Sequence, residues 1–551
     1  MKNIYKYLWL LLISIGFVAC EVDEIETSLP PEAEFPALNA GSLDFSKYVS
    51  VGASFTAGFT DNALFIAAQE NSFPNILAQQ FAQANGGSFS QPLMNDNVGG
   101  LLFGGSPMAD GSFGPRLFFN GAGPATLPGT PTTDAATVLS GPFNNVGVPG
   151  AKSFHVTFDG YGTLNPYFGR MASSAGASML GDALAQSPTF FTLSEIGGND
   201  VLGYATSGGT GVDQTGNFDP TQYGNNDITD PNVFAQVFSG MVTALTGSGA
   251  KGIVTNVPYI TDLAHFTTVP YAPLDPSNET FGPLIPTLNT VYGALNNVYA
   301  FLQFQGAITD AAARTITFST SAASAVVIKD EDLADLSAQI AGVLSASPDF
   351  AGLLASFGLP TDAGTVGAVA ALFGATFGQT RQATAEDLLV LPSSSIIGTV
   401  NADVFAFLQS QGLPAAVAGQ FSVEGITLPL EDKWVLIPSE QTAIKNATDA
   451  YNTTIEGVAS ANPNVALADF KGLLAEASTS GISFQEFTMT TDLVFGGLIS
   501  LDGVHLTARG YAFMAAVFLD VLDENFGSNF IDANVFPKAL DYNTIYSPSL
   551  P

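Results

Sequence analysis

The chain is poor in charged residues and poorest in basic ones. Charged side chains make up only 12% of its 551 residues, against a usual share of about 25%. The 15 lysines and arginines stand against 49 aspartates and glutamates, which gives a formal net charge of -34. Such a chain repels a phosphate backbone, so we expect no nucleic acid among its partners. Disorder throughout is also excluded, because 46% of the residues are hydrophobic and 11% are aromatic.

Cysteine occurs once and histidine three times. A single cysteine excludes a disulfide within the chain, and the sequence contains no His/Cys cluster of the kind that binds zinc. His155 and His265 have no carboxylate at a recognisable spacing, so we expect ordinary surface or loop roles for both. We therefore expect no metal and no other cofactor.

The N-terminus predicts a signal peptide over residues 1–19. Lys2 and Lys6 precede a short apolar run, which falls short of the ~20 residues that span a membrane comfortably. Small residues before Cys20 resemble a bacterial lipoprotein signal, which implies lipidation of Cys20. An ordinary signal peptide that happens to end near a cysteine is the alternative. Residues 20–47 are acidic and then proline-rich, as in a solvated tether.

Strand and helix patterns alternate along the chain. The strand candidates, rich in β-branched, aromatic or aliphatic residues, are 48–52, 189–196, 252–257 and 465–470. Helical patterns lie between or beside them, at 64–84, 439–459 and 507–522. This alternation predicts an α/β fold with a mostly parallel sheet covered on both faces. Active sites in such sheets gather at the carboxyl ends of strands, where Ser54, Asn199 and Pro258 fall.

Two long regions interrupt the alternation. Residues 86–145 are rich in glycine, proline, asparagine and phenylalanine, which predicts an irregular excursion. Residues 262–430 include helical, alanine-rich pieces at 333–344 and 363–377. This insertion would form either a hydrophobic lid or a helical unit packed against the sheet. The two parts of one α/β domain are then 48–261 and 431–551.

Two short segments far apart in the sequence carry the groups that acyl transfer needs. The segment YVSVGASFTAG, at 48–58, predicts a strand that ends at a glycine and presents Ser54. The segment DGVH places Asp502 three residues before His505, where a helical pattern begins. A hydroxyl, a base and an anion that orients the base together activate a serine nucleophile. Taken singly, Ser54 is as easily a helix cap and His505 an idle surface residue.

Two further segments offer donors to an oxyanion. Asn199 follows a pair of glycines at the end of a strand candidate, where a side-chain amide suits an oxyanion hole. A plain turn is the alternative. Gly150, in the segment NVGVPG, either brings a backbone N–H close to substrate or is only a loop glycine.

The order of these four segments resembles the SGNH/GDSL hydrolases. The resemblance is Gly-x-Ser at 52–54, the glycine segment at 145–150, Gly-x-Asn-Asp at 197–200 and Asp-x-x-His at 502–505. It covers residues 48–260 and 430–525 best. It implies a flavodoxin-like three-layer α/β/α fold and substrates among lipids, thioesters and acetylated sugars.

The resemblance also implies a role for each site residue. Ser54 corresponds to the nucleophile, His505 to the general base and Asp502 to the carboxylate that orients it. The oxyanion hole would consist of the N–H group of Ser54, Gly150 and Asn199. One departure is Ala53, which stands where the family usually has aspartate, so we expect altered local hydrogen bonding without loss of the chemistry.

The sequence as a whole predicts a lipid-anchored serine ester hydrolase that acts on a lipid or an acylated glycan. The signal, the tether and the segments at 257–259 and 267–270 resemble lipoproteins of Bacteroidetes-type bacteria, which implies an outer-membrane location facing the periplasm or the cell surface. A lipoprotein that keeps the fold but only binds hydrophobic ligands for an outer-membrane partner is the alternative. A structural surface protein is the third possibility.

Overall fold

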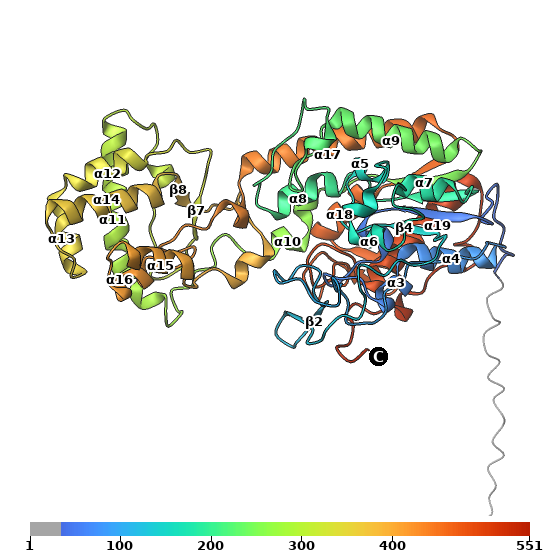
Figure 1. The fold of residues 1–551 in the computed structure, drawn as a ribbon, viewed down its shortest axis with the longest axis horizontal. Coiled ribbons are helices and arrows are strands. Elements are labelled where there is room, and N and C mark those ends of the chain that lie inside the picture. Colours follow the sequence, from blue (N-terminus) through green and yellow to red (C-terminus); the bar gives the residue numbers. More distant parts are fainter. Residues whose placement is uncertain (1–34, 551) are drawn as a thin grey trace, which may run out of the picture.

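The computed structural model describes residues 35–550, which form two adjoining lobes with separate hydrophobic cores (Figure 1). The larger lobe contains the sheet. The second core draws on residues between Val269 and Ile437. Cys20, the predicted signal peptide and most of the predicted tether lie outside the described residues. No helix within 35–550 has both the length and the apolar character needed to cross a bilayer.

A five-stranded parallel sheet organises the larger lobe. Its strands are β1 (Tyr48–Gly52), β4 (Asn145–Gly147), β5 (Phe190–Leu193), β6 (Lys251–Thr255) and β11 (Val465–Ala468). Their spatial order is β11-β6-β5-β1-β4, and all neighbours are parallel. Counted along the chain this is the order 2-1-3-4-5, as in flavodoxin-like sheets. The predicted α/β class and the four predicted strands are confirmed, whereas β4 was not predicted as a strand.

The strands lie buried because helices cover both faces of the sheet. Every residue of β1 and β5 is buried, which explains their continuous apolar and small residues in place of an alternating pattern. One face carries α7 (Met179–Leu184), α9 (Pro231–Thr246) and α17 (Pro438–Ala461), and the other carries α4 (Phe73–Gln83) and α19 (Ala508–Phe526) (Figure 1). Aromatic pairs join the helices of each layer. Phe234 stacks on Tyr451 with ring centres 4.3 Å apart, and Phe73 meets Phe518 at 5.1 Å.

The predicted helices are present with shifted ends. The pattern at 64–84 divides into α3 (Ile66–Glu70) and α4, because Pro74 sets the first turn of a new helix. At the start of α19, the hydroxyl of Thr507 accepts the backbone N–H of Gly510 at 3.0 Å, as an N-cap does. The short elements around the site are α2 (Ser54–Ala57), α5 (Ser153–Val156), α6 (Pro166–Gly169), α8 (Asn199–Thr206), α10 (Ala264–Thr267), α18 (Phe470–Thr479), β12 (Ile482–Phe484) and β13 (Phe487–Met489).

The excursion at 86–145 is irregular as predicted, apart from a hairpin of β2 (Leu117–Phe119) and β3 (Pro124–Thr126). The second lobe is mainly helical. Its helices are α11 (Ile285–Phe304), α12 (Ser337–Ser345), α13 (Pro348–Ser356), α14 (Ala363–Phe377), α15 (Ala402–Ser410) and α16 (Ala415–Gln420). Helices α12 and α14 pack so closely that a Cβ on Gly374 would lie 2.2 Å from the carbonyl oxygen of Ser337.

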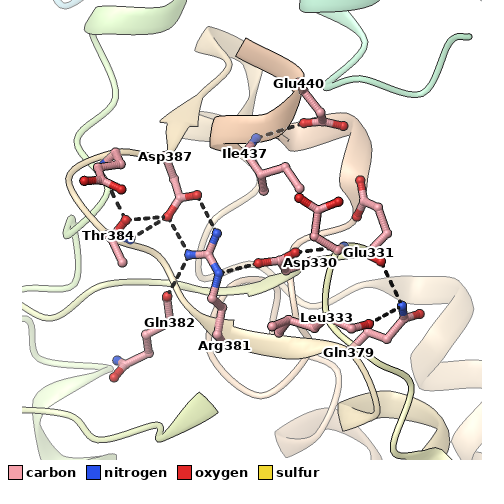
Figure 2. A network of polar contacts seen from close by, with 12 residues as sticks. Asp330, Glu331, Leu333, Gln379, Arg381, Gln382, Thr384, Asp387, Ile437 and Glu440 are labelled. Atoms are coloured by element: carbon pink, nitrogen blue, oxygen red, sulfur yellow. Dashed lines mark hydrogen bonds and ion pairs between the residues drawn. The ribbon is translucent and has the colours of Figure 1, made fainter. Parts of the chain in front are cut away.

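A buried ion-pair network holds the second lobe together near its connection to the sheet (Figure 2). Arg381 lies on β8 (Thr380–Gln382), which pairs with β7 (Val327–Lys329). Its guanidinium binds Asp330 at 2.5 Å and both carboxylate oxygens of Asp387 at 2.6 and 2.7 Å. Asp387 precedes β9 (Leu388–Leu389), which pairs with β10 (Val435–Leu436). The network therefore ties the segment after β7, strand β8 and the segment that leads into β9 to one another.

Candidate active site

Ser54 and Asn199 lie at the point where the strand order of the sheet reverses. Ser54 opens α2 after β1, and Asn199 opens α8 after the neighbouring strand β5. In a 2-1-3-4-5 sheet the crevice outside these two carboxyl ends is the usual ligand site. Gly52 is required at the turn, because a Cβ there would lie 2.1 Å from the hydroxyl of Thr56 and 2.7 Å from the carbonyl oxygen of Ser194.

Asp502 and His505 form the expected carboxylate–imidazole pair. Oδ2 of Asp502 lies 3.0 Å from Nδ1 of His505, while Oδ1 accepts the backbone N–H groups of Val504 and His505 at 2.9 and 2.8 Å. The side chains are 9% and 13% exposed. Burial opposes the charge on Asp502, but the neighbouring imidazole and these hydrogen bonds outweigh it and hold the pKa of the carboxyl well below its usual range. Asp502 is therefore ionised and can orient His505.

The segment that follows Ser54 packs against this pair. The His505 ring lies 5.7 Å from the ring of Phe55 and 4.7 Å from that of Phe59. The backbone N–H of Asn62 donates to Oδ2 of Asp502 at 2.8 Å. Within residues 35–550 no hydrogen bond joins the Ser54 hydroxyl to His505, and such bonds commonly tighten only when substrate is present. The structure thus brings the three predicted catalytic residues to one place.

Asn199 and Asp200 fasten the loop that carries Gly150. The amide of Asn199 donates to the carbonyl of Ala151 at 3.0 Å, and the buried carboxylate of Asp200 accepts the N–H and hydroxyl of Ser153 at 2.9 and 2.7 Å. Gly150 has φ +78°, and no atom lies within 4 Å of the position a Cβ would take. Gly150 and Asn199 both line one open cleft, and Asn199 also lines the cavity that has Ser54 in its wall.

Glu195 is a site residue that the sequence analysis missed. Its Oε1 accepts the backbone N–H groups of Ala53 and Thr56 at 2.6 and 2.9 Å, and its Oε2 accepts the hydroxyl of Ser194 at 2.7 Å. Helix α2 has no side-chain cap of its own, so Glu195, in the turn after β5, does what an N-cap residue at position 53 would do. The expected change in hydrogen bonding around Ala53 is therefore the recruitment of a different carboxyl.

Burial of Glu195 raises its pKa from 4.5 to about 7, against the opposing effect of its hydrogen bonds. Because the native state binds this proton more tightly than the unfolded chain does, the stabilisation is complete below about pH 4.5 and is lost as the pH rises through 7. Between pH 5 and pH 8 we expect the wild type to lose roughly 2 to 3 kcal/mol more unfolding free energy than Glu195→Gln does. Denaturant unfolding at the two pH values measures this difference.

The matched control for that experiment is Glu476→Gln, which removes an exposed glutamate of α18. This variant should keep the full pH dependence of the wild type. An equal pH dependence in Glu195→Gln and in the wild type would show that Glu195 is ionised in both the folded and the unfolded chain.

Asp61 is a second carboxyl beside the pair that the sequence did not indicate. Its Oδ1 accepts the backbone N–H of Leu501 at 3.1 Å, next to Asp502. Burial first, and then the charge of Asp502, raise the pKa of Asp61 to about 7. A neutral Asp61 can therefore hold the 500–505 loop without adding a second negative charge next to the imidazole.

The other two histidines do not join the pair. His265 was expected in a surface or loop role, but it is buried in α10, where its backbone N–H donates to the carbonyl of Gly503 at 2.9 Å and its ring nitrogens have no partner. Its packing on the 500–505 loop explains the burial, which lowers the pKa of the imidazole. His155 stacks on Tyr161 with ring centres 4.6 Å apart, and burial lowers its pKa to about 4.

Three carboxylates elsewhere meet closely enough to hold a cation. Glu331, Asp432 and Glu440 offer oxygens within 4.8 Å of one another, and Figure 2 labels Glu331 and Glu440. Burial, and then their mutual repulsion, raise the pKa of Asp432 and of Glu440. Protonation therefore accounts for their proximity, and none of the three lies in the cavity or cleft beside Ser54.

A cavity and a cleft adjoin the candidate site. An apolar cavity of about 110 Å³, partly open to the outside, has Ser54 and Asn199 in its wall. An open cleft of about 1220 Å³ has Gly150 and Asn199 in its wall. No residue between 269 and 437 lines either of them, so the helical lobe contributes no wall to the site.

Comparison with known proteins identified no relative of this chain. A scan against protein-family models gave no match, and searches of curated proteins and of solved structures gave no significant match.

Proposed function

We propose that this protein is a serine ester hydrolase of the SGNH/GDSL type. The observation that carries the proposal is the ionised Asp502, 3.0 Å from His505, packed against the aromatic residues that directly follow Ser54. The flavodoxin-like strand order and the position of Ser54 at its switch point are consistent with the fold of that family.

The reaction follows from the roles of these groups. Nε2 of His505 takes the proton of Ser54 as Oγ attacks the ester carbonyl, and Asp502 stabilises the imidazolium. The N–H groups of Ser54 and Gly150 and the amide of Asn199 stabilise the oxyanion, a contribution of about 3–4 kcal/mol for one such donor. His505 then protonates the leaving alcohol. Water, activated by His505, hydrolyses the acyl-enzyme, and no cofactor is required.

The proposal extends to location. Lipidation at Cys20 would anchor the hydrolase in the bacterial outer membrane, with the acidic tether between lipid and domain. Radiolabelled palmitate incorporated into the wild type but not into Cys20→Ala would test this part independently of the catalytic activity.

A fluorophosphonate probe tests the nucleophile directly, because it forms a covalent bond only with an activated serine. We expect about one probe per chain in the full-length wild type and none in Ser54→Ala. Ser460→Ala, which removes an exposed serine of α17, serves as the control and should label fully. Wild-type protein that is not labelled and hydrolyses no ester would refute the enzyme and favour the ligand-binding lipoprotein.

A further inference from the structure

The cavity beside Ser54 is almost entirely apolar on the side away from the sheet. Its far wall is formed by α18, β12 and α19, through Leu473, Leu474, Ile482, Phe513 and Met514. The polar groups in the wall come from the strand ends, where Ser54 and Asn199 lie. A cavity of this kind takes a hydrocarbon group and holds its polar end at the serine.

The open cleft also reaches the pair that holds the base, which the cavity touches through Phe55, Val504 and Leu506. Phe59, whose ring is 4.7 Å from that of His505, lines it, as does Asn62, whose N–H binds Asp502. Gly150 lines it as well. Its other side chains are largely aromatic and polar, including Phe154, His155 and Tyr223. Asn199 belongs to the walls of both the cavity and the cleft and therefore marks where they meet.

We propose that the apolar cavity holds the acyl chain of the substrate and the open cleft its alcohol, so that this protein hydrolyses esters of linear acids of roughly four to six carbons with large alcohols. The proposal rests on the ester hydrolase function given above and specifies its substrate class. It distinguishes the substrate both from acetylated glycans, whose acyl group would leave the cavity unfilled, and from long-chain lipids.

The order of the chemical steps decides which part of the ester goes where. When Ser54 Oγ bonds to the carbonyl carbon, the bond to the alcohol oxygen breaks, and that oxygen takes the proton that His505 removed from Ser54. The leaving alcohol must therefore lie on the His505 side and must escape, which the open cleft allows. The acyl group stays bonded to Ser54 until water adds to the carbonyl carbon, its proton passing through His505 back to Oγ, and the acid is released.

The size of the cavity limits the chain. An apolar cavity of about 150 Å³ accommodates a six-carbon ring, and this one measures about 110 Å³. A chain of about four to six carbons fills it, and the further carbons of a palmitoyl chain would find no room in it. Each methylene that fits raises kcat/KM by a factor of about 10 or more, and each methylene that does not fit lowers kcat/KM by a similar factor.

Leu474 is the position at which to test this assignment, because it lies on α18 and its side chain lines the cavity. We would measure kcat/KM of the full-length protein for p-nitrophenyl acetate, butyrate, hexanoate, decanoate and palmitate. The variants are Leu474→Trp, which fills the cavity, Leu474→Ala, which enlarges it, and Ser54→Ala. Thr479→Trp adds the same indole to the exposed side of the same helix and is the matched control.

In the wild type we expect a maximum at butyrate or hexanoate. Butyrate has two methylenes more than acetate and should be hydrolysed about a hundredfold or more faster, and palmitate should be slower than the maximum by a similar factor or more. Leu474→Trp should lower the ratio of hexanoate to acetate hydrolysis by about tenfold while acetate hydrolysis persists, and Leu474→Ala should move the maximum to a longer chain. Thr479→Trp should leave the profile unchanged. If Leu474→Trp does not fold, the direction of the Leu474→Ala shift decides.

Two results would overturn the proposal, and they differ in what they leave standing. Hydrolysis that depends on Ser54 but is fastest for acetate or palmitate, or that keeps its chain-length profile in both Leu474 variants, would refute the acyl cavity and leave the hydrolase. No hydrolysis dependent on Ser54 with any of the five esters would refute both.

Discussion

Replacing His505 with alanine is expected to lower kcat/KM for p-nitrophenyl butyrate by about 10⁴- to 10⁶-fold. The hydroxyl of Ser54 is a weak nucleophile unless a base removes its proton, and His505 is the imidazole held against Phe55 and Phe59 next to it. The double variant Ser54→Ala/His505→Ala should be no slower than either single variant, because the two groups act as one unit. Initial rates at substrate concentrations well below KM give the comparison.

His265→Ala is the matched control for this prediction. It also removes a buried imidazole next to the 500–505 loop, but its ring nitrogens have no hydrogen-bond partner. We expect its kcat/KM to stay within about tenfold of the wild type, because only packing is lost. If His265→Ala were as slow as His505→Ala while both remained folded, the loss would reflect loop packing and His505 would not be the base.

The sequence predicted those strands and helices whose own residue pattern indicates how they are buried. The strands β1, β5, β6 and β11 are continuous runs of apolar and small residues, because both faces of the sheet are covered. Helices α14 and α17 have strong helical patterns and were found to within two residues, and α19 was found but extends four residues beyond its predicted end. Strand β4 was not, since its three residues include asparagine and glycine, which strands disfavour. It pairs because β1 supplies its hydrogen bonds, a tertiary effect that leaves no local pattern.

The candidate site likewise contains residues that the sequence predicted and residues that it missed. Ser54, Asn199, Asp502 and His505 fall in short segments whose local chemistry is recognisable. Glu195 and Asp61 do not, because each acts on backbone groups far along the chain. Glu195 accepts N–H groups 139 and 142 positions away, and Asp61 accepts one 440 positions away. A charged residue directly after a buried strand was the one available signal for Glu195. Nothing in the sequence indicated that it would accept the backbone N–H of Ala53.

The separate core of the second lobe also depends on long-range packing. Its helical pieces were predicted, but apolar residues in a helix do not say which partner they will bury against. In the structure they bury against one another, so that the lobe stands beside the sheet (Figure 1). This arrangement leaves the walls of the cavity and the cleft to residues of the α/β lobe alone.

Asp502→Asn is expected to lower kcat/KM by about 10⁴-fold while the protein remains folded. One carboxylate has two roles here. Its Oδ1 accepts the N–H groups of Val504 and His505, and an asparagine oxygen can still do so. Its Oδ2 faces Nδ1 of His505, where the asparagine would place an NH₂ group. Nδ1 must then accept a hydrogen bond, which puts the proton on Nε2, and His505 can no longer take one from Ser54.

The two roles can be separated by measuring rate and stability together. Asp502→Asn should keep a thermal midpoint close to that of the wild type, apart from the lost contact between Asn62 and Oδ2. Asp492→Asn, at an exposed position nearby in the sequence, should change neither. Because the pKa of Asp502 is held well below its usual range, the wild type should show no loss of activity from its protonation above about pH 5. If folded Asp502→Asn lost activity by only a few-fold, the role of Asp502 would be limited to accepting backbone N–H groups in the 502–505 turn. The base would then need no orienting charge, which no serine–histidine mechanism of this kind predicts.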